Sequence, residues 1–172
     1  MTPFLQAALL LIFPVLVIVG ALRDLTSYTI PNWVSGLLIL GFFPAALVLG
    51  LPLSTIGFNL GVGAIALVLG VAMFALRWIG GGDAKLFAAA GLWLGWPASA
   101  EYLLITGLAG GVLTFALLGL RSVVVRPYVL SAPAWVNRLA TPDGDLPYGV
   151  AIAVGALAAF PNSALMAAWG GF

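Results

Sequence analysis

The stretch Gly80-Gly81-Gly82-Asp83-Ala84-Lys85 separates two strongly apolar segments of the chain. Three consecutive glycines disfavour both helix and strand, so the backbone here can take unusual torsion angles or approach another segment closely. Asp83 follows them at the point where the next apolar segment begins. An ionisable residue at a helix break inside a membrane is costly, and by default it marks a functional site.

The composition decides the environment of this stretch. Of 172 residues, 63% are hydrophobic and only 6% are charged, and the mean hydropathy is +1.21. A soluble domain of this size cannot hide so much apolar surface, so the chain is expected to lie in a lipid bilayer. We therefore predict an all-α, polytopic membrane protein with a single transmembrane domain over residues 1–172.

The polar residues restrict the chemistry. The chain has no cysteine and no histidine, which excludes disulfides, thiol nucleophiles, zinc sites of the Cys/His type and a histidine base. Acid–base chemistry therefore depends mainly on five carboxylates. The segment Asp143-Gly144-Asp145 has too few ligands for a calcium loop and is typical of a turn. We expect no metal, no cofactor and no nucleic-acid partner.

Apolar runs predict a bundle of six spanning helices, at residues 3–22, 33–49, 55–78, 84–96, 99–120 and 147–169, the last bent at Pro161. The fourth is too short to cross about 30 Å of hydrocarbon. It either begins part-way into the membrane or places Gly80 to Gly82 beside a polar cavity at membrane depth. The first run lacks a cleavage site and is expected to be retained. Part of the long connection, residues 129–139, could lie along the interface.

The charges support this count. With six helices, one side of the membrane receives all the basic residues: Arg23, Arg77, Lys85, Arg121, Arg126 and Arg138. The other side receives only Glu101 as a charged side chain. The positive-inside rule then makes the first side cytoplasmic and leaves both termini outside. A multi-pass protein of the plasma (inner) membrane is expected, with its aspartates at the cytoplasmic side.

Two of those aspartates lie at helix ends. Asp24 ends the first helix and Asp83 begins the fourth. Two carboxylates in close contact hold one proton between them, so one can activate water while the other polarises a carbonyl. Such a pair could hydrolyse a peptide without metal, thiol or serine. Alternatively, Asp83 caps its helix and Asp24 neutralises Arg23. Spacing alone does not show that the two helices touch.

Three ordered motifs add a resemblance that covers nearly the whole chain: Gly80 to Lys85, Asp24 followed by Ile30-Pro31-Asn32, and Pro147-Tyr148-Gly149. The first resembles the Gly-x-Gly-Asp-x-Lys signature of the type IV prepilin peptidases, which are intramembrane aspartic proteases. The second is similar to that family's other element, an aspartate shortly before Ile-Pro-Asn. The third is similar to the start of its last helix.

This resemblance implies that Asp24 and Asp83 are the catalytic pair. It also implies supporting or substrate-binding roles for Gly80, Gly82, Lys85, Pro31, Asn32, Pro147 and Tyr148. Lys85 would bias the ionisation of Asp83 or hold the substrate; alternatively, it is a lysine that snorkels from a helix end. Likewise, Pro147 and Tyr148 either line the substrate groove or merely start the last helix.

The implied substrates are prepilins or pseudopilins, cut on the cytoplasmic side just after a glycine that precedes their hydrophobic stem. Pilus assembly machinery is an implied partner. The chain lacks the cysteine-bearing cytoplasmic segment of the long members, so it resembles the short form that serves Flp/Tad-type pili. That absence puts methyltransferase activity in doubt.

The competing hypothesis is a non-enzymatic protein, either a small transporter or an assembly scaffold of a pilus or secretion machine. Ion-coupled transporters also use a broken helix with a carboxylate. Against this, the sequence shows no inverted repeat.

Overall fold

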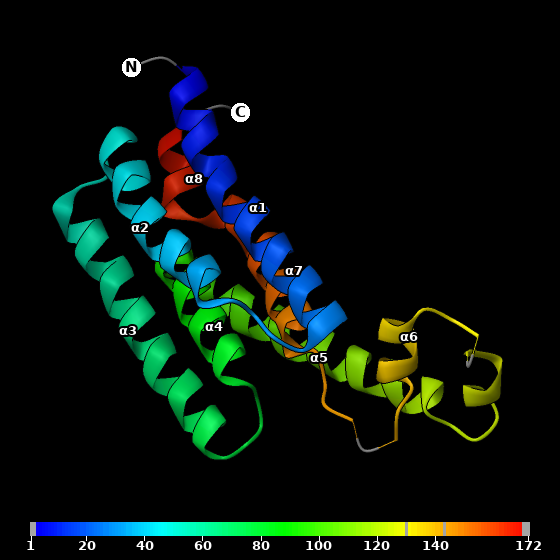
Figure 1. Ribbon diagram of the computed structural model, residues 1–172. Coiled ribbons are helices and arrows are strands. Elements are labelled where there is room, and N and C mark those ends of the chain that lie inside the picture. Colours follow the sequence, from blue (N-terminus) through cyan, green and yellow to red (C-terminus); the bar gives the residue numbers. More distant parts are fainter. Residues whose placement is uncertain (1–2, 130, 143, 170–172) are drawn as a thin grey trace.

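The apolar segments form helices throughout the part of the chain that this computed structural model describes, residues 3–129, 131–142 and 144–169. No strand occurs in those residues (Figure 1). The elements are α1 (Pro3–Ser27), α2 (Asn32–Val48), α3 (Leu53–Ala75), α4 (Gly81–Leu94), α5 (Ala98–Leu120), the 3-10 helix η1 (Arg126–Val129), α6 (Ala134–Leu139), α7 (Tyr148–Ala159), the 3-10 helix η2 (Phe160–Asn162) and α8 (Ala164–Trp169).

Four helical segments are long and apolar enough to cross a membrane: Pro3–Ser27, Leu53–Ala75, Ala98–Leu120 and Tyr148–Trp169. Helix α2 is apolar as well but has only 17 residues, and α4 has 14. The predicted all-α membrane fold is therefore confirmed. The count of six crossings remains a prediction, because two of the six helices are shorter than a typical span.

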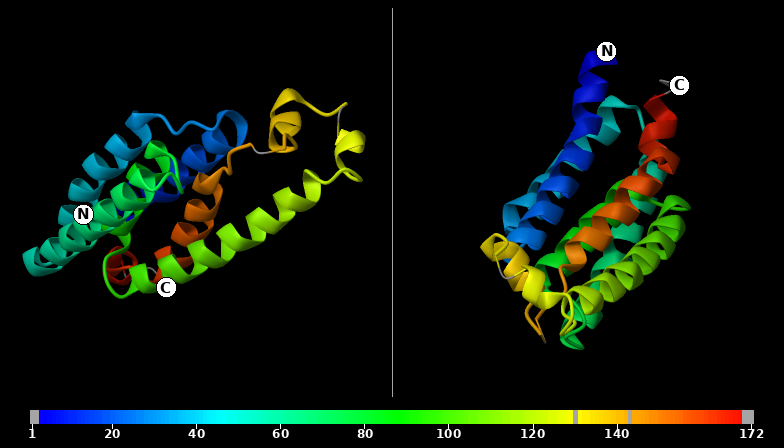
Figure 2. Two further views of the ribbon diagram at one scale, coloured as in Figure 1. Left: turned by 90° about the horizontal axis from the view of Figure 1, so that it is seen from below. Right: turned by 90° about the vertical axis from the view of Figure 1, so that its right-hand side faces the viewer.

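Helix α4 lies at the centre of the molecule (Figures 1 and 2). From Asp83 to Leu94, every residue except Lys85 is buried. Its neighbours include α1, α2, α3, α5 and α7. A helix that is apolar on all sides is stabilised by burial on all sides, and this position carries Asp83 into the interior.

Small residues let α4 approach α3 closely. A Cβ atom added at Gly70 would lie 3.0 Å from the carbonyl oxygen of Ala84, and one at Gly63 would lie 3.0 Å from Cβ of Leu92. Close backbone approach of this kind is how helices gain packing energy in a lipid environment, where hydrophobicity alone does not favour association.

Three helix ends differ from the sequence prediction. Helix α1 continues to Ser27, so Asp24 lies in its last turn. Helix α3 ends at Ala75, because Arg77 takes a left-handed conformation (φ 61°) and the Trp78 amide donates to the Met73 carbonyl, as in a Schellman cap. Helix α4 begins at Gly81, so two of the three glycines are helical, contrary to expectation.

The later part of the chain follows the prediction more closely. The interruption expected at Pro161 is confirmed by η2, which separates α7 from α8. Helix α5 projects beyond the rest of the bundle, and η1 and α6 lie near its end (Figures 1 and 2). Whether the segment 129–139 lies along a membrane interface stays a prediction.

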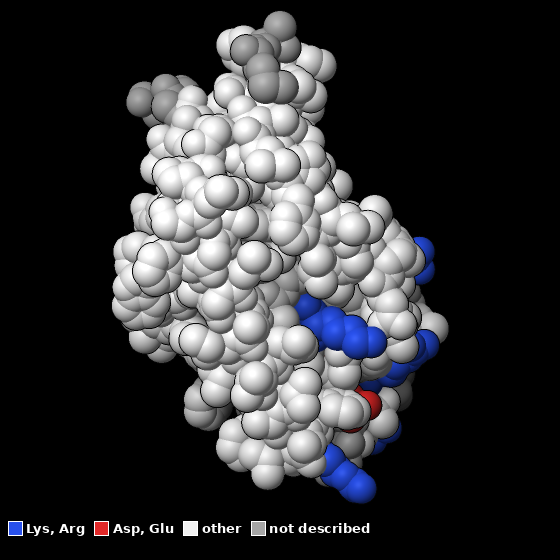
Figure 3. All heavy atoms as spheres, turned by 90° about the vertical axis from the view of Figure 1, so that its left-hand side faces the viewer, with Lys and Arg blue, Asp and Glu red and all other residues white. Residues whose placement is uncertain are grey.

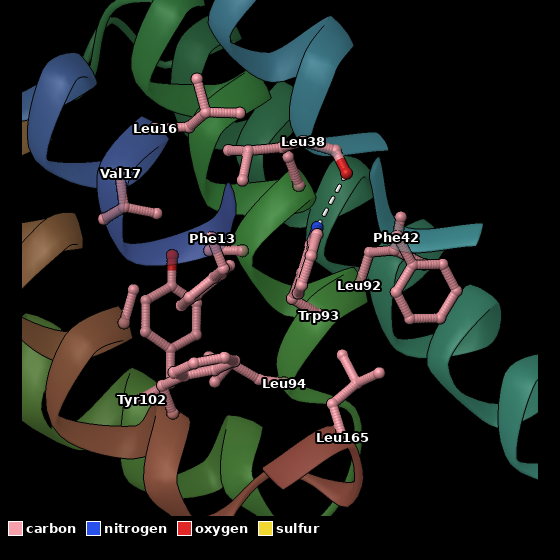
Figure 4. Packing of buried hydrophobic residues seen from close by; sticks show 14 of the residues in the cluster. Phe13, Leu16, Val17, Leu38, Phe42, Leu92, Trp93, Leu94, Tyr102 and Leu165 are labelled. Carbon is pink, nitrogen blue, oxygen red and sulfur yellow. Dashed lines mark hydrogen bonds between the residues drawn. The ribbon is translucent and has the colours of Figure 1, made fainter. Parts of the chain in front are cut away.

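Aromatic rings join the helices at the core (Figure 4). The ring of Phe13 stacks on Phe160 with centroids 4.5 Å apart, and it packs against Trp93 at 5.4 Å. The Trp93 indole N–H donates to the carbonyl oxygen of Leu38 over 2.7 Å, which satisfies the one polar atom that this side chain buries. These contacts hold α1, α2 and η2 in a fixed arrangement around the central helix α4.

Charged side chains are confined to one end of the bundle on the face that Figure 3 shows. Arg23, Arg77 and Arg121 lie at or just beyond the ends of α1, α3 and α5, and Lys85 lies near the start of α4. Glu101 lies in the first turn of α5, at the opposite end of that helix from Arg121. The basic residues therefore share one end of the molecule, as the sequence predicts.

Candidate active site

Asp24 and Asp83 line one cavity of about 430 Å³. Both are buried, with 4% and 5% of their surface exposed, and the two carboxyls lie close enough to interact electrostatically. Asp24 comes from the last turn of α1 and Asp83 from the first turn of α4. Two helices that are distant in the sequence thus bring their only buried carboxylates to one place.

Only one carboxylate oxygen of Asp83 accepts a hydrogen bond from the described residues. The Gly80 amide donates to Oδ2 of Asp83 over 3.0 Å, which caps the start of α4. Its Oδ1 is buried and has no hydrogen-bond partner among the residues that the structure describes. The capping role considered from the sequence is therefore real. This cap uses Oδ2 and leaves Oδ1 without a partner among the described residues.

Asp24 is held by the start of α7. The Gly149 amide donates to Oδ2 of Asp24 over 2.7 Å, and the same amide also interacts with the Asp83 carboxyl. A Cβ atom at position 149 would lie 2.9 Å from both Cβ and Oδ2 of Asp24, closer than real side chains pack. Only glycine fits here. One backbone N–H thus faces both acids and can stabilise negative charge between them.

The three sequence motifs meet at Ile30. A Cβ at Gly82 would lie 3.0 Å from Cβ of Ile30, and a Cβ at Gly149 would lie 2.9 Å from its Cδ1. The buried Ile30 side chain therefore packs between the glycines that begin α4 and α7. The sequence predicts site roles for Pro31, Asn32, Pro147 and Tyr148 but not for Ile30 or Gly149. The signal was present, because both belong to the motifs quoted above.

The cavity wall comes from three segments. Tyr28 follows α1, Arg77 and Trp78 follow α3, and Gly144 to Leu146 precede α7. Tyr28 and Arg77 have left-handed backbones, with φ of 52° and 61°. Such conformations are strained in residues other than glycine and cluster at functional sites. Burial raises the pKa of the Tyr28 hydroxyl, opposed by the nearby Arg121 guanidinium, so this hydroxyl stays protonated and able to donate at neutral pH.

Several predicted site residues lie outside this cavity. The Lys85 ammonium donates to Oδ1 of Asn32 over 2.8 Å, and both line a different cavity of about 360 Å³ between α2, α3 and α4. Gly82 faces Ile30. Their roles in substrate binding remain predictions.

The two predicted proline positions are helix starts. Pro31 precedes α2 and the buried Pro147 precedes α7. Tyr148 packs its ring against Gly110 of α5 and lines an apolar cavity. Asp145, which the sequence assigns to a turn, lines the cavity of the two buried aspartates, whereas Asp143 lies outside the described residues.

Across residues 3–129, 131–142 and 144–169, no group of three or more acidic side chains gathers that could hold a metal ion. Two buried carboxyls face a shared space, and one backbone amide lies within reach of both.

Residues 11–115, more than half of the chain, match the model of the type IV leader peptidase family. The matched region contains Asp24, the Ile30-Pro31-Asn32 motif and the stretch from Gly80 to Lys85. No curated protein and no solved structure matches the chain.

Proposed function

Because this chain belongs to the type IV leader peptidase family, we propose that it is an intramembrane aspartic endopeptidase that removes the leader peptide of prepilins. The observation that carries this proposal is the burial of Asp24 and Asp83 in one cavity. A leader peptidase of this composition has no cysteine or histidine available, and a pair of carboxyls is sufficient for peptide hydrolysis.

The proposed reaction needs the pair to carry one proton. The ionised carboxylate removes a proton from water, and the water oxygen attacks the scissile carbonyl carbon. The protonated carboxyl gives its proton to the carbonyl oxygen at the same time. The carbon–nitrogen bond then breaks, the nitrogen receives the first proton, and a hydroxyl of the intermediate returns the second. Water is consumed and the pair regains its starting state.

The surroundings of the pair favour a state in which one carboxyl is ionised and the other is protonated. Burial brings two like charges together in a site of low dielectric, where double ionisation is strongly disfavoured. The Gly149 amide can stabilise the remaining negative charge. We propose that the substrate lies extended across the cavity, because a helical peptide bond has its carbonyl already hydrogen-bonded and shielded.

The finer features of the proposal come from charge placement and motif resemblance. The basic end of the bundle faces the cytoplasm, the chain crosses the plasma membrane six times, and both termini lie outside. Cleavage then occurs on the cytoplasmic side, after a glycine, in Flp/Tad-type prepilins or pseudopilins. Machinery that assembles pili is the expected partner.

Co-expression with candidate Flp-type prepilins tests this function. The wild-type chain should shorten the prepilin, and mass spectrometry of the product should place the cut after a glycine. Asp24→Asn and Asp83→Asn should each leave the precursor intact. Glu101→Gln is the matched control. This carboxylate lies in the first turn of α5, away from Asp24 and Asp83, and accepts a hydrogen bond from the Asn162 amide. Cleavage by either aspartate variant at the wild-type rate would contradict the proposal.

A further inference from the structure

An apolar cavity adjoins the cavity that holds Asp24 and Asp83. A cavity of about 480 Å³ lies between α3 and α5, lined by residues such as Met73, Phe87 and Gly107. A smaller cavity of about 150 Å³ continues it toward Trp96. Because the two share Leu69, Phe87 and Leu103, they adjoin each other, and together they are here called the α3–α5 groove.

The α3–α5 groove reaches the catalytic pair. Trp78 and Ile79 line both the larger part of the groove and the cavity that contains Asp24 and Asp83. Phe87, on the floor of the groove, is one helical turn beyond Asp83 and so lies on the same face of α4. A chain lying in the groove would therefore leave it directly beside the two carboxyls.

The lining of the groove suits an apolar helix. It follows α4, whose 14 residues span about 21 Å at 1.5 Å per residue. Its lining is almost entirely apolar, and Gly107, where an added Cβ atom would meet nothing within 4 Å, leaves room for another helix to approach closely. Trp78 and Trp96 lie beyond the two ends of α4, with indole rings that are mostly exposed.

The groove on the opposite side of α4 differs in its polar lining residues and in its separation from the catalytic cavity. It is bounded by α2 and α3, carries the polar side chains of Asn32, Ser35 and Lys85, and shares no lining residue with the catalytic cavity. Lys85 is two residues from Asp83 and therefore points to a different side of the helix. A lipid can fill either groove, but only the α3–α5 groove shares lining residues with the cavity of Asp24 and Asp83.

We propose that the α3–α5 groove binds the apolar stem of the substrate as a helix, so that the segment leaving the stem unwinds past Trp78 and Ile79 into the cavity of Asp24 and Asp83. This inference rests on the proposed peptidase function. It assigns a docking surface to α3 and α5 and a guiding role to the two residues where groove and cavity join.

A substitution at Gly107 can block the groove without disturbing the packing of the chain. It lines the groove, and a Cβ atom there would meet nothing within 4 Å, so Gly107→Leu should fold normally and fill the binding space. We expect KM for a prepilin with its full stem to rise about tenfold, as for loss of a central contact in an interface. A short peptide that carries the cleavage site without the stem should be cut equally by both chains.

Gly36→Leu is the matched control, because Gly36 lines the α2–α3 groove and also has open space above it. This variant should retain the wild-type KM. If Gly36→Leu raised KM and Gly107→Leu did not, the stem would lie in the other groove and the proposal would be overturned. An equal rise in KM for the stemless peptide and for the full prepilin in Gly107→Leu would also overturn it, because the effect would then not depend on the stem.

A cross-link measures docking without catalysis. The natural chain contains no cysteine, so Gly107→Cys or Gly36→Cys in an Asp83→Asn background gives a unique thiol. With a prepilin carrying one cysteine in its stem, a disulfide is expected at position 107 and not at position 36. A missing cross-link at 107, beside normal cleavage by the wild-type chain, would refute the groove. A cross-link at 107 without wild-type cleavage would support the groove and reject the peptidase function.

Discussion

Gly149 is the residue whose contacts position Asp24 in the candidate site. Its amide donates to Asp24, while the absence of a side chain leaves room for Ile30. In Gly149→Ala, the added methyl group would push Asp24 away from Asp83, so we expect cleavage to fall about 100-fold, as for a displacement of roughly 1 Å in a catalytic group. The measurement is the rate of prepilin cleavage by purified protein in lipid vesicles.

Gly111→Ala is the control for that variant, because a Cβ at Gly111 meets nothing within 4 Å. It should cleave like the wild type and be equally stable to heating. Wild-type activity in Gly149→Ala would show that the amide and the packing at this position are dispensable.

The pair itself should behave as one catalytic unit. Asp24→Asn and Asp83→Asn should each abolish cleavage, and the double variant should be no worse than either single variant. Activity should be bell-shaped against pH. At low pH both carboxyls are protonated and no base remains, and at high pH both are ionised and no acid remains. A pH profile of kcat/KM checks this, and a chelator should leave the rate unchanged. Independent, additive losses in the two variants would contradict a shared proton.

Arg121 holds the connection between α5 and α7 in place. From the end of α5, its Nε donates to the Leu139 carbonyl over 2.9 Å and its Nη2 to the Asp145 carbonyl over 2.7 Å. These bonds fix the connection that leads into α7 and so position Gly149. Arg121→Gln should lower kcat about tenfold, because the start of α7 is less well placed, while KM changes little.

Arg126→Gln is the matched control, since Arg126 lines the same cavity at the end of α5 as Arg121, whereas the bonds to the Leu139 and Asp145 carbonyls come from Arg121. It should keep the wild-type kcat. If the two variants lost activity equally, the effect would come from the loss of positive charge and not from the two hydrogen bonds. Arg121→Lys should recover part of the rate, because lysine can donate to one of the two carbonyls.

The helices were largely predictable because lipid-facing and buried segments are both apolar, and each run is bounded by polar or helix-breaking residues. The start of α4 was not, since glycine disfavours an isolated helix. Here, close packing of Gly82 against Ile30 and of Gly81 against Phe74 offsets that preference. Such contacts depend on segments distant in the sequence. For the same reason, the motifs identified Asp24 and Asp83 but could not show that Gly149 lies between them.

Charge placement is the feature that orients the whole molecule. The basic residues share one end of the bundle with Asp24 and Asp83, and Glu101 lies at the other end. The cost of carrying positive charge across the membrane predicts that the basic end stays in the cytoplasm. Single cysteines can test this, because the chain has none of its own and both Ser54 and Arg126 are exposed.

In intact cells, an impermeant maleimide should label Ser54→Cys at the start of α3, while Arg126→Cys should react only after the membrane is opened. Both variants should still cleave prepilin, which verifies that the labelled chains are folded. Labelling of both positions from the same side would reject the six-crossing topology. Labelling of Arg126→Cys alone in intact cells would invert it, and would place the catalytic pair on the outer side of the membrane.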